Sequence, residues 1–229
     1  MLHLAIEQPG DFDIRLNGVQ LPAEDDAGWW CDQSLRLLPV NPALLQVGLN
    51  ELTLSNTRYT ARSNLEIIYL LGNFGVALRG TDASLTRPPA TLKLGDWTRQ
   101  GLPFYSGNLT YLWRNVKVPL HARAQCLLRI PAFRGTAIRV LVNGRPAGIA
   151  AWPPYEVDIT GHCAGKPLTI GVEILGHRRN SHGPLHHTEK WPRWTGPAEF
   201  ETRDALWRED YQLVPCGLMA PPEILIRQA

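Results

Sequence analysis

The chain has 229 residues, enough to bury the core of one large domain or two smaller ones. Its 23 basic and 21 acidic residues leave a formal charge of only +2, and the basic residues are scattered, so no nucleic-acid partner is expected. The four cysteines form no C-x-x-C pair, which excludes zinc-finger spacing and a dense disulfide scaffold.

The N-terminal residues MLHLAIEQPGDFDIRL carry charges and a proline where a secretory signal needs a continuous apolar run. No apolar run of about 18 residues occurs elsewhere, so we expect a soluble chain with no membrane partner. Two origins stay open: a signal removed before this chain begins, or a longer parent protein of which this chain is a piece. Secretion or a periplasmic location would fit either of them.

The predicted structure consists mainly of strands. The 20 glycines and 19 prolines interrupt most windows of the chain, so helices are expected to be few. Apolar runs bounded by turn residues are expected to be strands. These runs are His3–Ile6, Phe12–Leu16, Leu35–Val40, Glu51–Leu54, Leu65–Leu71, Leu109–Val118, Gln125–Ile130, Ile138–Val142, Leu168–Ile174 and Tyr211–Val214. Many short strands with closely spaced turns are typical of a β-sandwich.

Two tight hairpins are expected at Asn17-Gly18 and Asn143-Gly144, because both dipeptides tolerate the positive φ angles of a type I′ turn and lie between apolar runs. The segments WWCDQSLRLLPV and LLQVGLNELTLS follow the first hairpin, and AWPPYEVDIT and AGKPLTIGVEIL follow the second. The order of hairpin, tryptophan, acidic residue, glycine turn and strand therefore occurs twice. It predicts two related sandwich units with an internal repeat of about 125 residues.

A connector is expected at Arg87-Pro88-Pro89, where proline favours an extended backbone and the preceding polar residues lack periodicity. The predicted domains are a partial β-sandwich at residues 1–88 and a more complete one at residues 89–229. The partner strands of the first could lie upstream in a longer protein or come from the second. Sheet edges left open by an incomplete unit could also pair between chains, so a dimer is left open.

Five short motifs follow one another along the chain. They are LEIIYLLGNFGVALRG, LKLGDWTRQGLPFYSGNLTY, VLVNGRPAGIAAWPPYEVDIT, RRNSHGPLHH and WTGPAEF. From Phe12 to Pro222 the chain resembles the C-terminal part of large bacterial glycoside hydrolases related to family 2 and to α-L-rhamnosidases. The resemblance implies an all-β fold of tandem galactose-binding-like jelly-roll β-sandwiches. It also implies a non-catalytic accessory module that binds carbohydrate or packs on the catalytic domain of the same parent enzyme.

No catalytic machinery for glycoside hydrolysis is evident in the sequence. A (β/α)₈ barrel needs about 250 residues with eight helices, and this chain has room for neither. Glycoside hydrolysis in its common form needs two carboxyl groups about 5–10 Å apart, and no motif pairs any two of the candidates. The candidates are Glu66, Asp96, Asp158, Glu199 and Glu201. We expect them to cap turns and strand ends, and we expect no enzymatic activity from this chain alone.

The stretch NSHGPLHHTEKWPRWTGP, residues 180–197, is rich in hydrogen-bonding and stacking side chains but has no apolar periodicity. A transition-metal site would use His182, His186 and His187. However, Gly183-Pro184 disfavours the helix needed to align the first two, and the last two would point apart in an extended chain. We expect no metal cofactor, with a structural calcium ion held by carbonyls and carboxylates as the alternative.

The same stretch also fits a sugar site, which combines a flat aromatic ring with fixed donors and acceptors because a pyranose has an apolar face and a rim of hydroxyls. The predicted substrate-binding residues are Arg178, Asn180, His182, His186, Trp191, Trp194, Trp97 and Tyr105. Arg179 lies among them in the sequence, and Trp29, Trp30 and Asp32 form a similar group in the first unit.

A structural role for residues 180–197 is the competing interpretation and our first expectation. Tryptophans in β-sandwiches are commonly core or edge-covering residues, and histidine and arginine side chains can pin a long loop to its own backbone. Trp194→Ala separates the two interpretations. It reduces saccharide affinity if the residue contacts sugar, and it reduces stability if the residue fills a cavity.

Three functions remain in competition at this point. The leading one is a carbohydrate-binding or accessory module of a polysaccharide-degrading glycoside hydrolase. The second is an active glycosidase or lyase that uses carboxylates on the sandwich, and the third is an assembly module whose tryptophan surfaces bind another protein domain. The sequence specifies neither the sugar nor the linkage.

Overall fold

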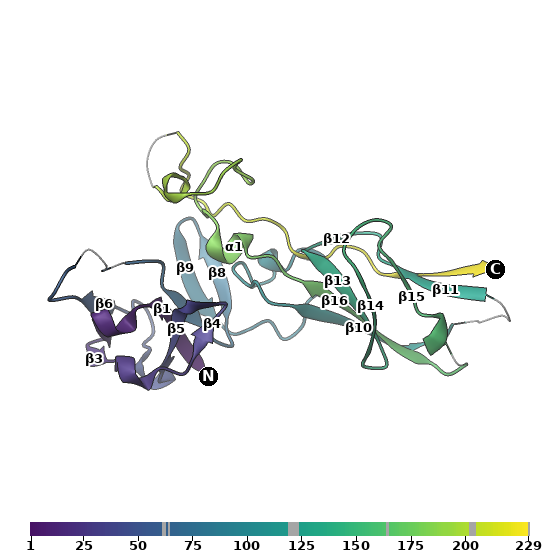
Figure 1. Ribbon diagram of the computed structural model, residues 1–229, viewed down its shortest axis with the longest axis horizontal. Helices are drawn as coiled ribbons and strands as arrows, with labels where there is room; N and C mark the ends of the chain where they lie inside the picture. The colour runs from purple at the N-terminus through teal and green to yellow at the C-terminus, as the bar shows by residue number, and fades with distance from the viewer. Residues whose placement is uncertain (61–62, 64, 119–123, 164, 202–204, 229) are drawn as a thin grey trace. The chain divides into compact units, whose positions relative to one another are not determined.

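The computed structural model describes residues 1–60, 63, 65–118, 124–163, 165–201 and 205–228. These residues form an all-β protein, and the α-helix among them, α1 (Arg179–His182), is a single turn. The chain divides into two compact units, Met1–Phe74 and Gly75–Ala229 (Figure 1). No helix in the part of the chain that the structure describes is long and apolar enough to cross a membrane.

The first unit contains two antiparallel sheets. One has the strand order β4 (Trp29–Trp30), β5 (Asp32–Val40), β1 (Leu2–Glu7), β7 (Tyr69–Leu71), and the other has the order β3 (Val19–Gln20), β2 (Asp13–Leu16), β6 (Leu52–Ser55). Because alternate residues of a strand point to the same face, Leu2, Leu4 and Ile6 of β1 share one side. They pack with Ile14 and Leu16 of β2 in a single apolar cluster, so the two sheets enclose a common core.

The second unit is larger. Its four-stranded sheet has the order β10 (Leu109–Val116), β16 (Leu168–Leu175), β13 (Ala137–Val142), β14 (Arg145–Ala150), and its three-stranded sheet has the order β15 (Glu156–Asp158), β11 (Ala124–Arg129), β18 (Glu223–Gln228). Two short ribbons pair β12 (Phe133–Arg134) with β17 (Gly217–Leu218) and β8 (Gly75–Arg79) with β9 (Asp82–Thr86). All of these pairings are antiparallel.

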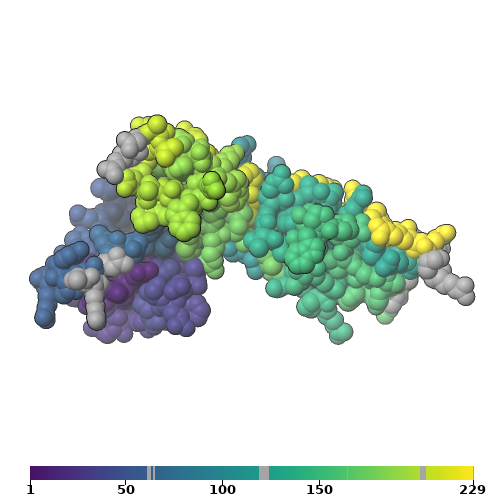
Figure 2. All heavy atoms as spheres, turned by 45° about the horizontal axis from the view of Figure 1, so that its top comes forward, coloured from purple at the N-terminus to yellow at the C-terminus, as the bar shows by residue number. Residues whose placement is uncertain are grey.

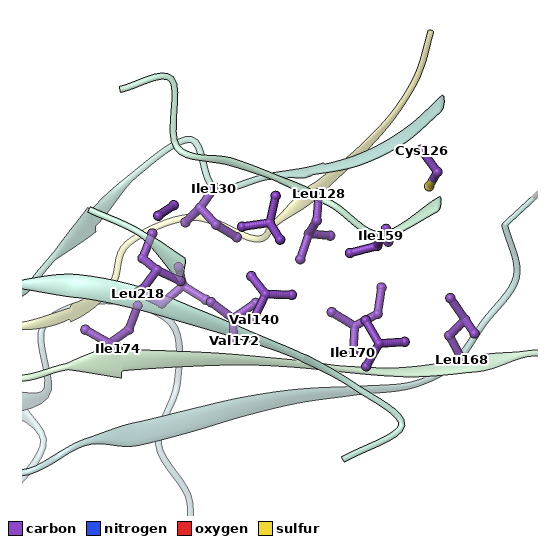
Figure 3. Packing of buried hydrophobic residues seen from close by; sticks show 14 of the residues in the cluster. Cys126, Leu128, Ile130, Val140, Ile159, Leu168, Ile170, Val172, Ile174 and Leu218 are labelled. Carbon is purple, nitrogen blue, oxygen red and sulfur yellow. The ribbon is translucent and has the colours of Figure 1, made fainter. Parts of the chain in front are cut away.

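The core of the second unit lies between its two larger sheets. Figure 3 shows Leu128 on the ribbon of the three-stranded sheet facing Val140 and Val172 on the four-stranded sheet. Alternate residues of β13, such as Val140 and Val142, are fully buried, as expected for a strand with one face in the core. The β-sandwich that the strand pattern predicted is therefore confirmed.

The remaining turns are short 3-10 segments. They are η1 (Pro9–Asp11), η2 (Ala23–Asp25), η3 (Pro42–Leu44), η4 (Trp97–Arg99), η5 (Thr160–His162) and η6 (Pro197–Phe200).

Both predicted hairpins are confirmed. Asn17-Gly18 joins β2 to β3 with φ angles of 50° and 80°, and Asn143-Gly144 joins β13 to β14 with φ angles of 51° and 76°. The two asparagines also make the same pair of bonds. Glu51 N donates to the Asn17 carboxamide at 2.8 Å, and Thr169 N donates to that of Asn143 at 2.9 Å. The backbone N–H of each asparagine returns a bond to the carbonyl of the same partner, so each turn is tied to a neighbouring segment in the same way.

The predicted strand at Tyr211–Val214 was wrong, because its backbone groups bond to a loop and not to a sheet. Gln212 N donates to Leu185 O, and Val214 N donates to the side chain of Asn180. The run Leu65–Leu71 is also shorter than predicted, since only Tyr69–Leu71 pairs, with β1. The ribbon β8–β9 was missed because β9 is exposed along its whole length and has only Ala83 and Leu85 as apolar residues.

The division between the compact units precedes β8, whereas the predicted connector at Arg87-Pro88-Pro89 follows β9. Two bonds explain why the ribbon groups with the second unit. Val76 N donates to Gly101 O at 2.9 Å, and the Tyr211 hydroxyl donates to Thr81 O at 3.2 Å. The domain boundaries at residue 88 stay a prediction.

Candidate functional site

The most unusual segment of the second unit is the connection between β16 and β17, which we call the aromatic loop and define as residues 177–215. Within it the described residues contain only α1 and η6 as helical turns. Its atoms are drawn in green to yellow-green in Figure 2. Irregular connections longer than about 15 residues are uncommon in compact domains and are often functional.

The base of the aromatic loop is held by Asn180, which is completely buried. Its Nδ2 donates to Val214 O at 2.8 Å, and Val214 N donates to its Oδ1 at 2.8 Å. A carboxamide carries both an NH2 donor group and a carbonyl acceptor, so it can satisfy both backbone groups of a single residue, as a neighbouring strand would. Asn180 was predicted to bind substrate, but both ends of its amide are occupied by Val214.

A stem of paired backbone continues outward from this base. Thr188 N donates to Leu206 O at 2.8 Å, and Arg208 N donates to His186 O at 2.8 Å. His187 and Trp207 form an antiparallel bridge between these bonds. The aromatic loop therefore leaves the sandwich as a short two-stranded stem that holds its outer part.

The predicted histidines are engaged within the loop. His186 Nδ1 lies 3.1 Å from Arg208 O, which can only accept, so this nitrogen carries the proton. His187 Nδ1 accepts from Glu189 N at 3.0 Å. His182 Nδ1 lies 2.7 Å from Ser181 Oγ, and burial lowers the pKa of His182, with a smaller contribution from the nearby positive charge of Arg178. Among the described residues, no group of three or more His, Cys, Asp or Glu side chains is arranged to hold a metal ion.

The outer part of the loop presents two tryptophans to solvent. Trp191 is 64% exposed and Trp194 is 75% exposed. The ring of Trp191 lies edge-on to that of His177, with centroids 6.4 Å apart. A Cβ added at Gly196 would lie 2.7 Å from Trp194 Nε1, so the indole lies directly against the glycine backbone.

The aromatic loop also contains buried polar atoms without hydrogen-bond partners among the described residues. Arg179 Nε donates to Lys190 O at 3.0 Å, but its Nη1 and Nη2 are buried and find no acceptor among the described residues. Burial lowers the pKa of Arg179. His177 Nδ1 and Trp207 Nε1 are buried in the same unpartnered state. His177 was absent from the predicted site, and no pattern in the sequence singles it out.

The other predicted residues lie in different settings. Trp97 is fully buried in the core, where its ring meets the edge of Tyr105 at 6.0 Å, while Tyr105 is 38% exposed and its hydroxyl donates to Asn108 O at 3.0 Å. Trp97 N donates to Cys216 O at 2.9 Å, which connects this cluster to the end of the aromatic loop. Arg178 is exposed immediately before α1.

Three of the carboxylates considered for catalysis, Asp96, Asp158 and Glu199, accept hydrogen bonds from nearby backbone N–H groups and so cap turns. Asp96 Oδ1 accepts from Thr98 N at 2.9 Å and from Cys216 N at 3.1 Å. Glu199 accepts from Gly196 N at 2.7 Å. Hydrogen bonds from the Thr160 and Gln125 side chains lower the pKa of Asp158 to about 2, which favours its ionised form.

No known family model matches the chain, and the search of curated proteins found no match. Among solved structures the chain is similar to a rhamnosidase from Novosphingobium sp. PP1Y, with 17% sequence identity and a TM-score of 0.41. The alignment covers 95% of this chain and 21% of that one, so the chain spans about a fifth of the rhamnosidase. We infer the function from the side chains of the aromatic loop itself.

Proposed function

We propose that the chain is a non-catalytic module that binds carbohydrate through the aromatic loop and serves a polysaccharide-degrading glycoside hydrolase. The proposal rests on one observation: Trp191 and Trp194 are mostly exposed on a loop whose base is fixed by buried bonds and whose stem is paired through its backbone. The catalytic domain of the same parent enzyme is the proposed protein partner.

The exposure of the tryptophans argues for a ligand. A large apolar ring left in water gives up roughly 1.5–3 kcal/mol of burial free energy, so two of them on one loop suggest a surface that is covered in use. A pyranose ring stacks on a flat indole through its C–H face. Because the stem already orders the loop, little conformational entropy is lost when a saccharide binds.

Trp194→Ala tests the proposal. We expect the affinity for a bound oligosaccharide to fall by about 1–3 kcal/mol, because a stacking surface is removed. The free energy of unfolding should change by no more than about 0.5 kcal/mol, because the side chain is mostly exposed. Calorimetric titration against a glycan panel and denaturant unfolding measure the two quantities.

Trp152→Ala is the matched control, since Trp152 is 78% exposed but lies outside the aromatic loop. It should leave saccharide affinity unchanged. Equal weakening by both substitutions, or no binding to any glycan, would count against the proposal. Binding only to the parent catalytic domain would favour the assembly module instead.

We also expect the isolated chain to show no enzyme-like hydrolysis of aryl glycosides. The reason is that Asp96, Asp158 and Glu199 are held as turn caps, and a pair of facing carboxyl groups is needed for the common mechanism. Turnover in the usual range of about 1–1000 s⁻¹, abolished by replacing Glu66, Asp96, Asp158 or Glu199, would contradict this expectation.

A further inference from the structure

Arg179 differs from the paired arginines of this chain. Among the described residues, the arginines that lie within ion-pair distance of a carboxylate are Arg15, Arg36, Arg99, Arg129, Arg139, Arg208 and Arg227. Arg179 has no such partner among the described residues, although its two terminal nitrogens are buried. Arg179 thus combines buried terminal nitrogens with the lack of a carboxylate partner among the described residues.

An unpaired buried guanidinium is unfavourable. The group keeps its proton at physiological pH, and taking a charge out of water without a counter-charge destabilises the fold. Its planar donors match the two oxygens of an anion such as a carboxylate, which can accept from both nitrogens at once. Nη1 and Nη2 therefore suit a bidentate anionic ligand.

The groups around Arg179 suit a saccharide. Arg179 Nε donates to the carbonyl oxygen of Lys190, which directly precedes Trp191. The ring of Trp191 in turn lies edge-on to that of His177. His177 Nε2 lies 3.4 Å from Pro215 O, which only accepts, so in the neutral ring the proton is on Nε2 and Nδ1 is an acceptor. Nδ1 could accept from a sugar hydroxyl. Residues 177–191 thus supply a stacking ring from Trp191, a hydroxyl acceptor in His177 Nδ1 and the two terminal donors of the Arg179 guanidinium.

We infer that the saccharide bound by the aromatic loop is anionic, with a carboxylate or sulfate group that pairs with Nη1 and Nη2 of Arg179. This inference rests on the proposed function and adds the class of sugar. Because the two nitrogens have almost no exposed surface, the covering chain has to shift when the anion binds. Gly183 is part of that cover, since a Cβ added there would lie 2.6 Å from Nη1.

The test compares charged and neutral forms of the same sugar. Oligogalacturonate and its methyl ester differ in the carboxylate, and dextran sulfate and dextran differ in the sulfate. We expect the wild-type chain to bind one charged member at least about 10-fold more tightly than its neutral counterpart, because hydrogen bonds to charged groups are the strong ones. Preference within the first pair identifies a carboxylate, and preference within the second identifies a sulfate.

Arg179→Met removes the charge and leaves an unbranched apolar side chain of similar reach. We expect the ratio of the two affinities to fall to about 1, with an unchanged or higher melting temperature, because replacing an unpaired buried charge is neutral or stabilising. Arg145→Gln removes the same charge from the exposed Asn143-Gly144 hairpin and should leave the ratio unchanged. Equal loss of the ratio in both variants would indicate nonspecific attraction and overturn the inference.

Two further outcomes would also overturn it. If Arg179→Met loses stability and all saccharide binding together, Arg179 has a structural role. If the wild type binds the neutral and charged forms equally, the inference fails while the proposed function stands. Failure of the wild type to bind any saccharide would instead refute the proposed function.

Discussion

Trp97→Ala is expected to lower the free energy of unfolding by about 3–5 kcal/mol, as other large-to-small core substitutions do. Trp97 is fully buried, and it packs in the apolar cluster between the two larger sheets of the second unit. Its backbone N also donates to Cys216 O, so the cavity would open where the aromatic loop returns to the sandwich. Urea unfolding followed by far-UV circular dichroism measures the loss.

Trp97→Phe provides the control for this prediction. The indole Nε1 of Trp97 has no hydrogen-bond partner among the described residues, so replacement by phenylalanine removes side-chain volume but no hydrogen bond. It should therefore lower the free energy of unfolding less than replacement by alanine. Trp97 was predicted from the sequence to bind substrate. A variant with unchanged stability and weakened saccharide binding would support that role over the core role argued here.

Asn180→Ala is expected to open the base of the aromatic loop, with a local destabilisation of about 2–6 kcal/mol. The substitution leaves Val214 N and Val214 O buried without partners, and each unsatisfied group costs about 1–3 kcal/mol. Because loops can open without global unfolding, hydrogen exchange at the Val214 amide is the direct measurement. The expected loss of protection is roughly 30- to 20,000-fold, since each 1.4 kcal/mol is a factor of ten.

The same variant should weaken saccharide binding, because the stem that holds Trp191 and Trp194 would lose its anchor. Ser181→Ala is the matched control: its hydroxyl bonds to Arg178 O at 3.2 Å within the turn itself. That substitution should leave Val214 protection almost unchanged. If Asn180→Ala exchanges as slowly as wild type at Val214, the carboxamide is not the anchor.

Local patterns predicted part of the fold well. The Asn-Gly dipeptides placed both hairpins, because the positive φ angles they require depend on the dipeptide and little else. Strands such as β13 were recognisable as apolar runs bounded by turn residues. By contrast, β9 is exposed along its whole length and β17 has only two residues, so their pairing partners reveal them as strands.

The candidate site was predicted in composition but not in arrangement. Trp191 and Trp194 were identified as aromatic surfaces, and the structure leaves both exposed. Asn180 and Trp97 are of residue types that are common in sugar sites, yet both are buried. Their exposure depends on what packs over them, which the sequence around each residue does not encode.

The sequence by itself determined the all-β character and the two hairpins, because strands and tight turns follow from short-range backbone preferences. It also showed directly that residues 180–197 are rich in aromatic side chains. Only the tertiary structure decided which of these residues meet. Asn180 and Val214 are joined by side-chain hydrogen bonds across the loop, and the run that holds Val214 looked like a strand until that partner was known. The unpaired guanidinium of Arg179 is likewise visible only in three dimensions, since a charge becomes unfavourable when the folded chain removes water from it without supplying an anion.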